Sequence, residues 1–262
     1  MRILPLVLIV LLSALPISCG GSSGISSPVN PTPTYPNLTG DWSVLAESEV
    51  TTAMNELGGH MTNTGASVSA TLHVDPLVES NCYQPEEEIP FTGTVTTSGS
   101  ISLISNAVAG QTITITGIAV NGGIEGTYKI AGGCAAGDSG LVIGVTQASY
   151  TGNYTGTFQP LSGSAVNVSV NMVQSGSNAD GEYSVSGTAK FSGSSCFTTG
   201  TITSSTIFGE YLQVAMSTDN DGAVQFTGTG MATLAGMTID GAYLVTAGPC
   251  AGASGSGFLN QS

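Results

Sequence analysis

The sequence predicts an all-β protein made of two tandem antiparallel up-and-down β-barrels, each of about eight strands. Three observations support this prediction. The second half of the chain repeats motifs of the first half at nearly the same spacing, apolar and polar residues alternate along short segments, and no window beyond the N-terminus shows a long helical period. Two β-sandwiches are the alternative fold, because short alternating strands also build sandwiches.

The N-terminus has the features of an export signal over residues 1–18. Arg2 is followed by an apolar run that is too short for a bilayer span, which needs about 20 residues. The segment LPISCGG at 15–21 resembles the lipobox of bacterial lipoproteins, although Pro16 stands where that pattern usually has an aliphatic residue. The resemblance implies cleavage after Ser18 and attachment of a lipid to Cys19. Ordinary cleavage without a lipid is the alternative.

Residues 19–37 are rich in glycine and serine and then in proline, which is typical of a tether between an anchor and a folded body. The whole chain has a net charge of −14, and cleavage would remove Arg2 and leave Lys129 and Lys190 as the basic residues. Nucleic-acid binding requires basic side chains that neutralise phosphates, so we exclude nucleic acid as a partner. Anionic lipid head groups would also repel this surface, so the expected membrane contact is the N-terminal lipid.

The repeat defines two domains, at residues 38–147 and 150–262. LTGDW at 38–42 matches YTGNY at 150–154, SNCY at 80–83 matches SSCF at 194–197, and IEGTYKIAGGCAAG at 124–137 matches IDGAYLVTAGPCAG at 239–252. The two cysteines of each copy lie 52 and 54 residues apart. Agreement at several anchors indicates a duplicated domain of ordinary size.

Alternation predicts the strands of the second copy individually. The segment AVNVSVNMV at 165–173 alternates strictly, and glycine, serine, asparagine and aspartate clusters separate such segments. The pattern predicts strands near residues 150–158, 164–173, 182–191, 198–203, 208–217, 223–232, 236–245 and 254–259. The first copy gives a similar count but is less clear between Glu49 and Asn63.

The five cysteines fit an exported protein with two disulfides and one cysteine left over, Cys19. In a meander, all odd-numbered connections lie at one end of the barrel, and the two cysteines of each copy fall in odd connections. We therefore expect pairs Cys82 with Cys134 and Cys196 with Cys250, each stabilising its copy by about 4 kcal/mol in the chain-entropy model. Pairing across the copies would not explain the repeated spacing.

The LTGDW motif resembles the first-strand opening of avidin-like and lipocalin-like barrels of the calycin type, which share a G-x-W element and eight antiparallel strands. The resemblance implies the same architecture here, and barrels of this size can hold one small ligand. The chain departs from these families because it has only Trp42, whereas biotin binders use several tryptophans. It also lacks, after cleavage, the arginine that lipocalins often place against the tryptophan. The resemblance therefore implies no ligand residues.

The segment CAAGDSGLVIG at 134–144 is similar to the nucleophile segment of chymotrypsin-like proteases, with Ser139 as the candidate nucleophile. A serine protease also needs a histidine base and an aspartate that orients it. The corresponding segment of the second copy is CAGASGSG, with Ala253 in the place of Asp138. We interpret the segment as a turn that leads into the last strand, and we predict that the protein is not an enzyme.

We predict neither a metal site nor a cofactor. His60 and His73 have no free cysteine to join them, and we interpret His73 as a surface residue on the polar face of its strand. The acidic insertion QPEEEIP at 84–90 offers oxygen ligands that Ca²⁺ favours, but its spacing does not match an EF-hand, so a solvated loop is expected.

These observations lead to three functional hypotheses. The first is a non-catalytic binding module for a small apolar ligand, anchored by lipid in the bacterial cell envelope, at the outer membrane or cell surface. The second is a structural or adhesive surface protein whose barrels are filled by their own side chains. The third is a hydrolase that uses Ser139. A cavity of several hundred Å³ favours the first hypothesis and continuous packing the second.

Overall fold

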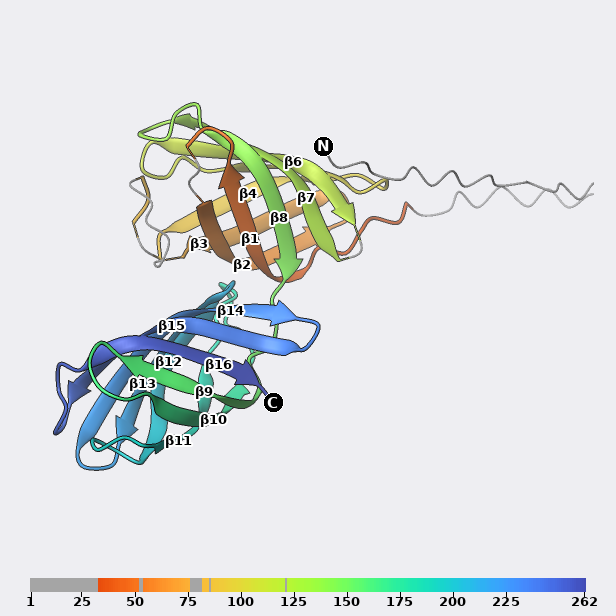
Figure 1. Cartoon of the computed structure of the whole chain (residues 1–262). Coiled ribbons are helices and arrows are strands. Elements are labelled where there is room, and N and C mark those ends of the chain that lie inside the picture. The colour runs from red at the N-terminus through yellow and green to blue at the C-terminus, as the bar shows by residue number, and fades with distance from the viewer. Residues whose placement is uncertain (1–32, 52–53, 76–81, 85, 121) are drawn as a thin grey trace, which may run out of the picture. The chain divides into compact units, whose positions relative to one another are not determined.

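The first barrel consists of eight consecutive strands in the computed structural model, which describes residues 33–51, 54–75, 82–84, 86–120 and 122–262 (Figure 1). Their bounds are β1 (Gly40–Ser48), β2 (Met54–Thr64), β3 (Ser67–Val74), β4 (Glu88–Val95), β5 (Ser100–Ser105), β6 (Gln111–Val120), β7 (Gly123–Gly132) and β8 (Ser139–Thr146). Each strand pairs antiparallel with the next, and β8 pairs with β1 to close the sheet.

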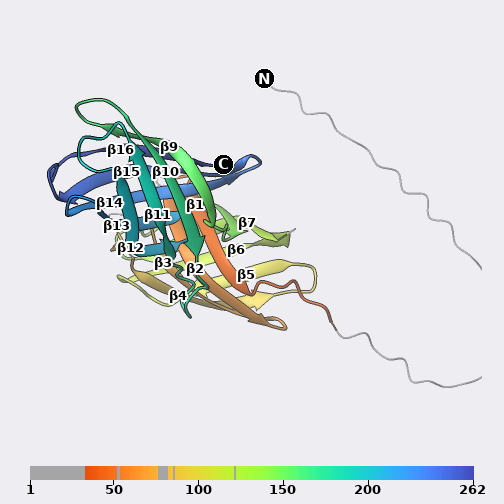
Figure 2. The same ribbon diagram turned by 90° about the horizontal axis from the view of Figure 1, so that it is seen from below.

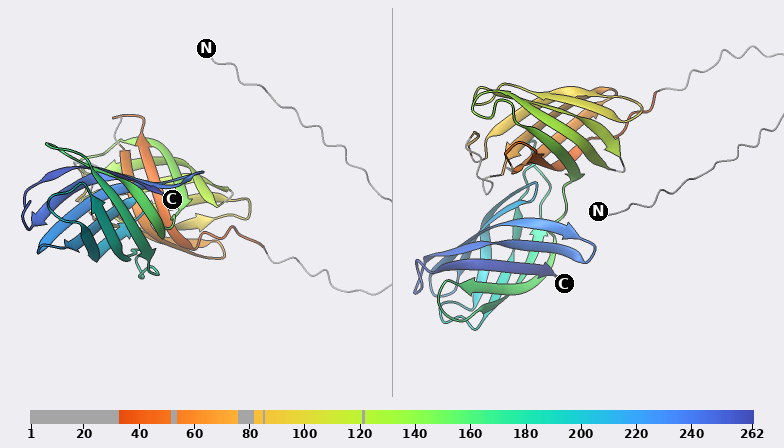
Figure 3. Two further views of the ribbon diagram at one scale, coloured as in Figure 1. Left: turned by 60° about the horizontal axis from the view of Figure 1, so that its bottom comes forward. Right: turned by 45° about the horizontal axis from the view of Figure 1, so that its top comes forward.

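The second barrel repeats this arrangement with the next eight strands. Their bounds are β9 (Gly152–Pro160), β10 (Val166–Gln174), β11 (Val185–Ser192), β12 (Thr199–Phe208), β13 (Tyr211–Thr218), β14 (Gly222–Thr233), β15 (Gly236–Ala247) and β16 (Ser254–Gln261). Strand β16 pairs with β9, so this sheet is also closed. Figures 2 and 3 show the strands of each barrel wrapping round into a continuous wall.

Closure leaves neither sheet with an unpaired edge among the described strands, which removes the usual template for aggregation. The predicted up-and-down barrels are therefore confirmed, and the β-sandwich alternative is wrong. No helix occurs in the described part of the chain, and none there is long and apolar enough to cross a membrane.

The largest difference from the predicted strands is at β12, which continues to Phe208 although alternation predicted an end near residue 203. The register of β12 against β13 shifts between Ile202 and Ser204, so alternation breaks in the middle of a continuous strand. In the first copy, Leu57, Gly58 and Gly59 of β2 are buried in succession, which explains why no alternation was visible there.

One end of each barrel is closed by the aromatic residue of the repeated opening motif. The Trp42 indole Nε1 donates a hydrogen bond to the Leu38 carbonyl at 2.9 Å, and the Tyr154 hydroxyl donates to the Tyr150 carbonyl at 3.1 Å. All four residues are buried. The two copies thus use the same contact between a ring and the carbonyl four residues earlier, with tryptophan in one copy and tyrosine in the other.

The interiors of the barrels are filled by side chains. The cavity inside the first barrel, beside Val44 and Ile115, measures about 10 Å³. The cavity inside the second, beside Val170 and Phe226, measures about 20 Å³. Neither volume can hold more than about one water molecule, so the two interiors serve as hydrophobic cores.

The disulfides join the cysteines within each copy, Cys82 to Cys134 and Cys196 to Cys250, with Cα–Cα distances of 5.7 Å. Each bridge links the connection after the third strand to the connection after the seventh strand of its barrel. These connections lie at the end opposite Trp42 or Tyr154. We call this the disulfide end, or mouth, of each barrel.

The two barrels contact each other within one compact unit, Thr34–Ser262. A Cβ atom added to Gly58 of β2 would lie 2.2 Å from the backbone nitrogen of Gly209, so backbones of the two barrels approach without intervening side chains. The ring of His73 lies 5.8 Å from that of Phe208. His73 is half-buried and its Nε2 is enclosed, so the interpretation of this residue as a surface histidine was wrong.

Candidate functional site

A cavity of about 420 Å³ lies at the mouth of the second barrel. It is lined by the ends of the strands and by three connections, those between β9 and β10, between β11 and β12, and between β15 and β16. In an up-and-down barrel these odd connections share one end, which is why segments distant in sequence meet here. The volume falls in the range of about 300–1,000 Å³ that is common for small-molecule sites.

The inner wall of this mouth cavity is aromatic. Phe158 and Tyr243 are stacked, with ring centroids 4.6 Å apart and planes at 10°, and Phe197 forms another part of the lining. Phe197 is in turn packed edge-on against Phe191 at 4.7 Å. Aromatic rings held in this way present large, rigid apolar surfaces at little entropic cost to a ligand.

The outer rim is polar but uncharged. It includes Ser162, Ser164, Ser194 and Ser195, and none of the lining residues is an aspartate, glutamate, histidine, lysine or arginine. The Ser194 hydroxyl accepts a hydrogen bond from the backbone nitrogen of Cys196 at 3.1 Å, which helps to fix the wall that carries the disulfide. The cavity therefore combines an apolar wall with a neutral hydroxyl rim.

Strand register identifies equivalent positions at the mouths of the two barrels. Tyr128 lies on β7 and pairs with a residue of β6 in the first barrel. Tyr243 lies on β15 and pairs with a residue of β14 in the second. Asp138 and Ala253 are also equivalent, because the carbonyl of each accepts a hydrogen bond at 2.8 Å from the residue two positions after that tyrosine.

Ser48 and Pro160 form the third equivalent pair. Each is the last residue of the first strand of its barrel and faces a glycine of the last strand, Gly140 in one copy and Gly255 in the other. The three pairs can therefore be compared position by position.

At the mouth of the first barrel these positions form a polar closure. The Tyr128 hydroxyl donates to Asp138 Oδ2 at 2.8 Å, and the Ser48 hydroxyl donates to Asp138 Oδ1 at 2.5 Å. Burial, together with the neighbouring Asp138 carboxylate, raises the pKa of Tyr128 to about 12. The tyrosine is therefore a neutral donor that binds a carboxylate of its own chain.

Gln111 adds a second layer to this closure. It is almost fully buried, its Nε2 donates to the Cys82 carbonyl at 3.0 Å, and its Oε1 accepts from the Ala135 nitrogen at 3.0 Å. The residue that pairs at this position in the second barrel is Ala223, which cannot make such bonds.

At the mouth of the second barrel the closure is missing because its polar residues are replaced. Ala253 and Pro160 stand in the places of Asp138 and Ser48, and both line the cavity. Tyr243 lines it as well, and its hydroxyl makes no hydrogen bond to any residue that the structure describes. Burial raises the pKa of Tyr243, so its hydroxyl is also a neutral donor.

Ser139 is the first residue of β8 and belongs to the closure of the first barrel. Its neighbour Asp138 bonds Ser48 and Tyr128, and no histidine among the described residues is hydrogen bonded to Ser139. Its carbonyl accepts from the Glu49 nitrogen at 3.0 Å. The structure thus places GDSG where a turn leads into β8, as the comparison of the two copies predicted.

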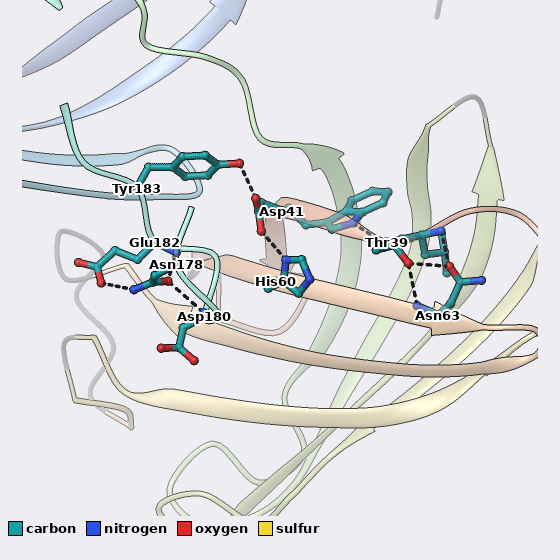
Figure 4. Close-up of polar contacts among 10 residues, drawn as sticks. Thr39, Asp41, His60, Asn63, Asn178, Asp180, Glu182 and Tyr183 are labelled. Carbon is teal, nitrogen blue, oxygen red and sulfur yellow. Dashed lines mark hydrogen bonds and ion pairs between the residues drawn. The ribbon is translucent and has the colours of Figure 1, made fainter. Parts of the chain in front are cut away.

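His60 is engaged at the contact between the barrels (Figure 4). Its Nδ1 lies 2.6 Å from Asp41 Oδ1, and the Tyr183 hydroxyl of the second barrel donates to Asp41 Oδ2. Burial alone would raise the pKa of Asp41, but the hydrogen bonds from Tyr183 and His60 outweigh it and lower this pKa. Asp41 therefore joins the two barrels as an anionic acceptor.

The remaining predicted features lie outside the mouth cavity. Cys19 and the tether up to residue 32 fall outside the described residues. In the acidic insertion, Glu87 Oε2 accepts from the Gln84 nitrogen at 2.8 Å, and the described residues contain no cluster of three acidic, histidine or cysteine side chains that could hold a metal ion.

The sequence prediction named the cysteines near the cavity but missed its aromatic wall and Tyr243. The second copy has Ala253 at the position where the first copy has Asp138. This difference is the sequence signal that could have located the cavity.

A scan against models of known protein families finds no match, and neither does a search among curated proteins. Among solved structures, the chain is similar to a candidate outer membrane protein of Bacteroides fragilis, with 10% identity, a TM-score of 0.31, and coverage of 87% of this chain and 97% of that one. It is also similar to kievitone hydratase from Nectria haematococca, with 9% identity, a TM-score of 0.24, and coverage of 86% and 90%. Scores this low carry no argument about function.

Proposed function

We propose that this protein is an exported, lipid-anchored binding module of the bacterial envelope that holds a small apolar ligand at the mouth of its second barrel and does no chemistry on it. The observation that carries the proposal is the cavity of about 420 Å³ with its wall of Phe158, Phe197 and Tyr243. Its opening toward solvent lets a ligand enter without unfolding the barrel, and the disulfide Cys196–Cys250 holds the wall in place.

The absence of charge around the cavity supports an apolar, uncharged ligand. A charged ligand would lose hydration without gaining an ion pair from the lining. The net charge of −14 further opposes the approach of anions. The first barrel supports a division of labour, because the equivalent mouth is closed by bonds among Ser48, Tyr128 and Asp138.

Titration with the uncharged fluorescent probe prodan tests this proposal. We expect saturable binding of one probe molecule to the wild type. We expect loss of that binding in Ala253→Trp, because Ala253 lines the cavity and an indole there would occupy it. Ala251→Trp is the matched control, since Ala251 is an exposed residue of the same turn and does not line the cavity.

Two outcomes would contradict the proposal. One is that the wild type shows no saturable binding of prodan. The other is that Ala253→Trp and Ala251→Trp bind the probe as tightly as the wild type. Thermal melting of both variants shows whether the barrels remain folded, so that loss of binding can be assigned to the filled cavity.

A structural or adhesive role is the second candidate, and a different observation favours it. The barrel interiors are filled, with cavities of about 10 and 20 Å³, so neither can hold a ligand at its centre. If the wild type fails to bind small probes, this role becomes the better account. A hydrolase that uses Ser139 has no support from the described contacts of this residue.

Export and lipid attachment are supported by the cysteines. Four of the five form disulfides, which persist in oxidising compartments, and Cys19 is the one left over. The mass of the mature protein tests the anchor. We expect a chain that begins at Cys19 and carries a diacylglyceryl addition, and we expect Cys19→Ser to abolish the addition. A mature chain without the lipid would contradict this part of the proposal.

A further inference from the structure

The first barrel shows which chemical group its mouth accommodates, because a carboxylate of its own chain occupies it. The Asp138 carboxylate receives one hydrogen bond from Tyr128 and another from Ser48. The equivalent place in the second barrel, between Tyr243 and Ala253, belongs to the mouth cavity. Both copies have the tyrosine that donates, but the second copy lacks the carboxylate that accepts.

We infer that the Tyr243 hydroxyl anchors the ligand of the second barrel by donating a hydrogen bond to an uncharged oxygen acceptor, such as a carbonyl, that takes the place of the Asp138 carboxylate. This inference rests on the proposed function of the cavity. It assigns a specific polar contact to a site that otherwise offers only apolar walls and a serine rim.

The acceptor is uncharged because the second barrel lacks the other donor. Pro160 stands where Ser48 donates in the first barrel, and proline has neither a hydroxyl nor a backbone N–H. A carboxylate held by Tyr243 alone would keep most of its lone pairs unsatisfied in an apolar site, which is costly. A carbonyl oxygen needs fewer partners and is satisfied by one good donor.

The rest of the ligand is a flat ring system. Tyr243 is stacked on Phe158, so the hydroxyl that would bind the oxygen belongs to the aromatic wall itself. A planar ligand with its oxygen at one edge can contact the wall and the hydroxyl together. We therefore expect aromatic or otherwise flat ketones, or similar neutral oxygen-bearing ring compounds, to bind more tightly than the corresponding hydrocarbons.

The test compares two probes and two proteins. Prodan carries a carbonyl, and its parent (dimethylamino)naphthalene has the same ring system without it. Tyr243→Phe keeps the ring and removes only the hydroxyl. We expect the substitution to weaken prodan binding by between about twofold and tenfold, as for the loss of one neutral hydrogen bond, and to leave the affinity of the parent compound unchanged.

Tyr128→Phe is the matched control in the first barrel. It removes the equivalent hydroxyl, which is bonded to Asp138 there, and we expect both probes to bind it as they bind the wild type. A second variant, Pro160→Ser combined with Ala253→Asp, introduces the residue types of the first barrel and should close the mouth to both probes.

The results distinguish a failure of the Tyr243 inference from a failure of the proposed function. Equal affinity of Tyr243→Phe and wild type for prodan, or an equal loss for both probes, would overturn the inference while leaving the cavity as a binding site. Failure of both probes to bind the wild type would overturn the proposed function itself. Unchanged binding of both probes by the Pro160→Ser, Ala253→Asp variant would contradict the equivalence of the two mouths.

Discussion

At the scale of single residues, the difference between the two barrels depends on which side chains stand at the ends of their strands. Asp138 and Ser48 make a hydrogen-bonded closure with Tyr128, whereas alanine and proline occupy the equivalent positions of the second copy. A duplication that leaves two similar domains can specialise in this way without changing the fold. One domain has a hydrogen-bonded closure at its mouth, and the other has a cavity there.

The GDSG segment gives a residue-scale prediction that separates structure from catalysis. We expect Asp138→Ala to lower the free energy of unfolding by about 1–3 kcal/mol, because it leaves the hydroxyls of Ser48 and Tyr128 without their acceptor. Ser139→Ala should change it by less than about 0.5 kcal/mol. Urea denaturation of both variants measures these effects. A larger loss for Ser139→Ala than for Asp138→Ala would show that the roles are assigned wrongly.

At the scale of strands and connections, the disulfide of the second barrel is part of the cavity wall. Cys196 and Cys250 both line the mouth cavity. They are 54 residues apart in the sequence and are joined by a disulfide. We expect the double variant Cys196→Ser, Cys250→Ser to lose about 4 kcal/mol of stability in the chain-entropy model. The same variant should bind prodan more weakly, because the connections that carry the wall are no longer tied together.

The corresponding double variant in the first barrel, Cys82→Ser with Cys134→Ser, is the control for this prediction. Its loss of stability should be similar, because the cysteines are separated by 52 residues, but prodan binding should not change. Denaturation curves and probe titration on the two double variants give both readouts. Equal loss of probe binding in both variants would contradict the assignment of the site to the second barrel.

Most elements could be predicted from the sequence because alternation reports burial on one face of a strand. The prediction was poorest where a second constraint acted on the chain. Strand β2 contacts the other barrel through Gly58, so residues that would otherwise alternate are buried together, and β12 contains a register shift near Ile202. The cavity was missed for another reason. It depends on the size of a few side chains at strand ends, such as Ala253, and periodicity does not record this.

At the scale of the whole molecule, the two barrels are held together by a close contact that a methyl group should disrupt. We expect Gly58→Ala to loosen it, because the added Cβ would lie 2.2 Å from the backbone nitrogen of Gly209. The cost should be about 1–3 kcal/mol, as for other overpacked sites. Native-state hydrogen exchange of the amides of Tyr183 and Ile207 measures it, and faster exchange is expected.

Gly176→Ala serves as the control for this substitution, because a Cβ atom there meets nothing within 4 Å. We expect its exchange rates to match those of the wild type. If Gly58→Ala also leaves the exchange rates of the Tyr183 and Ile207 amides unchanged, the two barrels do not pack closely at Gly58.

The contact between the barrels also makes stability depend on pH. Burial raises the pKa of Glu56 to about 7, and the hydrogen bond and charge of Asp75 and the charge of Glu210 act in the same direction. Burial raises the pKa of Glu210 as well. Between 4.5, the ordinary value, and about 7, the folded protein retains a proton on Glu56 that the unfolded chain has lost. Stability therefore falls as pH rises through this window.

Urea denaturation at about pH 5 and pH 8 tests this expectation. The wild type should have the lower midpoint at the higher pH, and Glu56→Gln should reduce the difference because it cannot ionise. Glu125→Gln is the control, since Glu125 is exposed on β7, and it should keep the wild-type difference. A rise in the wild-type midpoint between these pH values, or no effect of Glu56→Gln, would contradict the role of Glu56.

Native mass spectrometry of the protein purified from the organism that makes it shows whether the mouth of the second barrel holds a ligand. We expect the wild type to carry one additional mass, which is absent from the denatured spectrum and from the Ala253→Trp variant. A wild-type protein that carries no additional mass, or a variant that retains the same mass as the wild type, would contradict it.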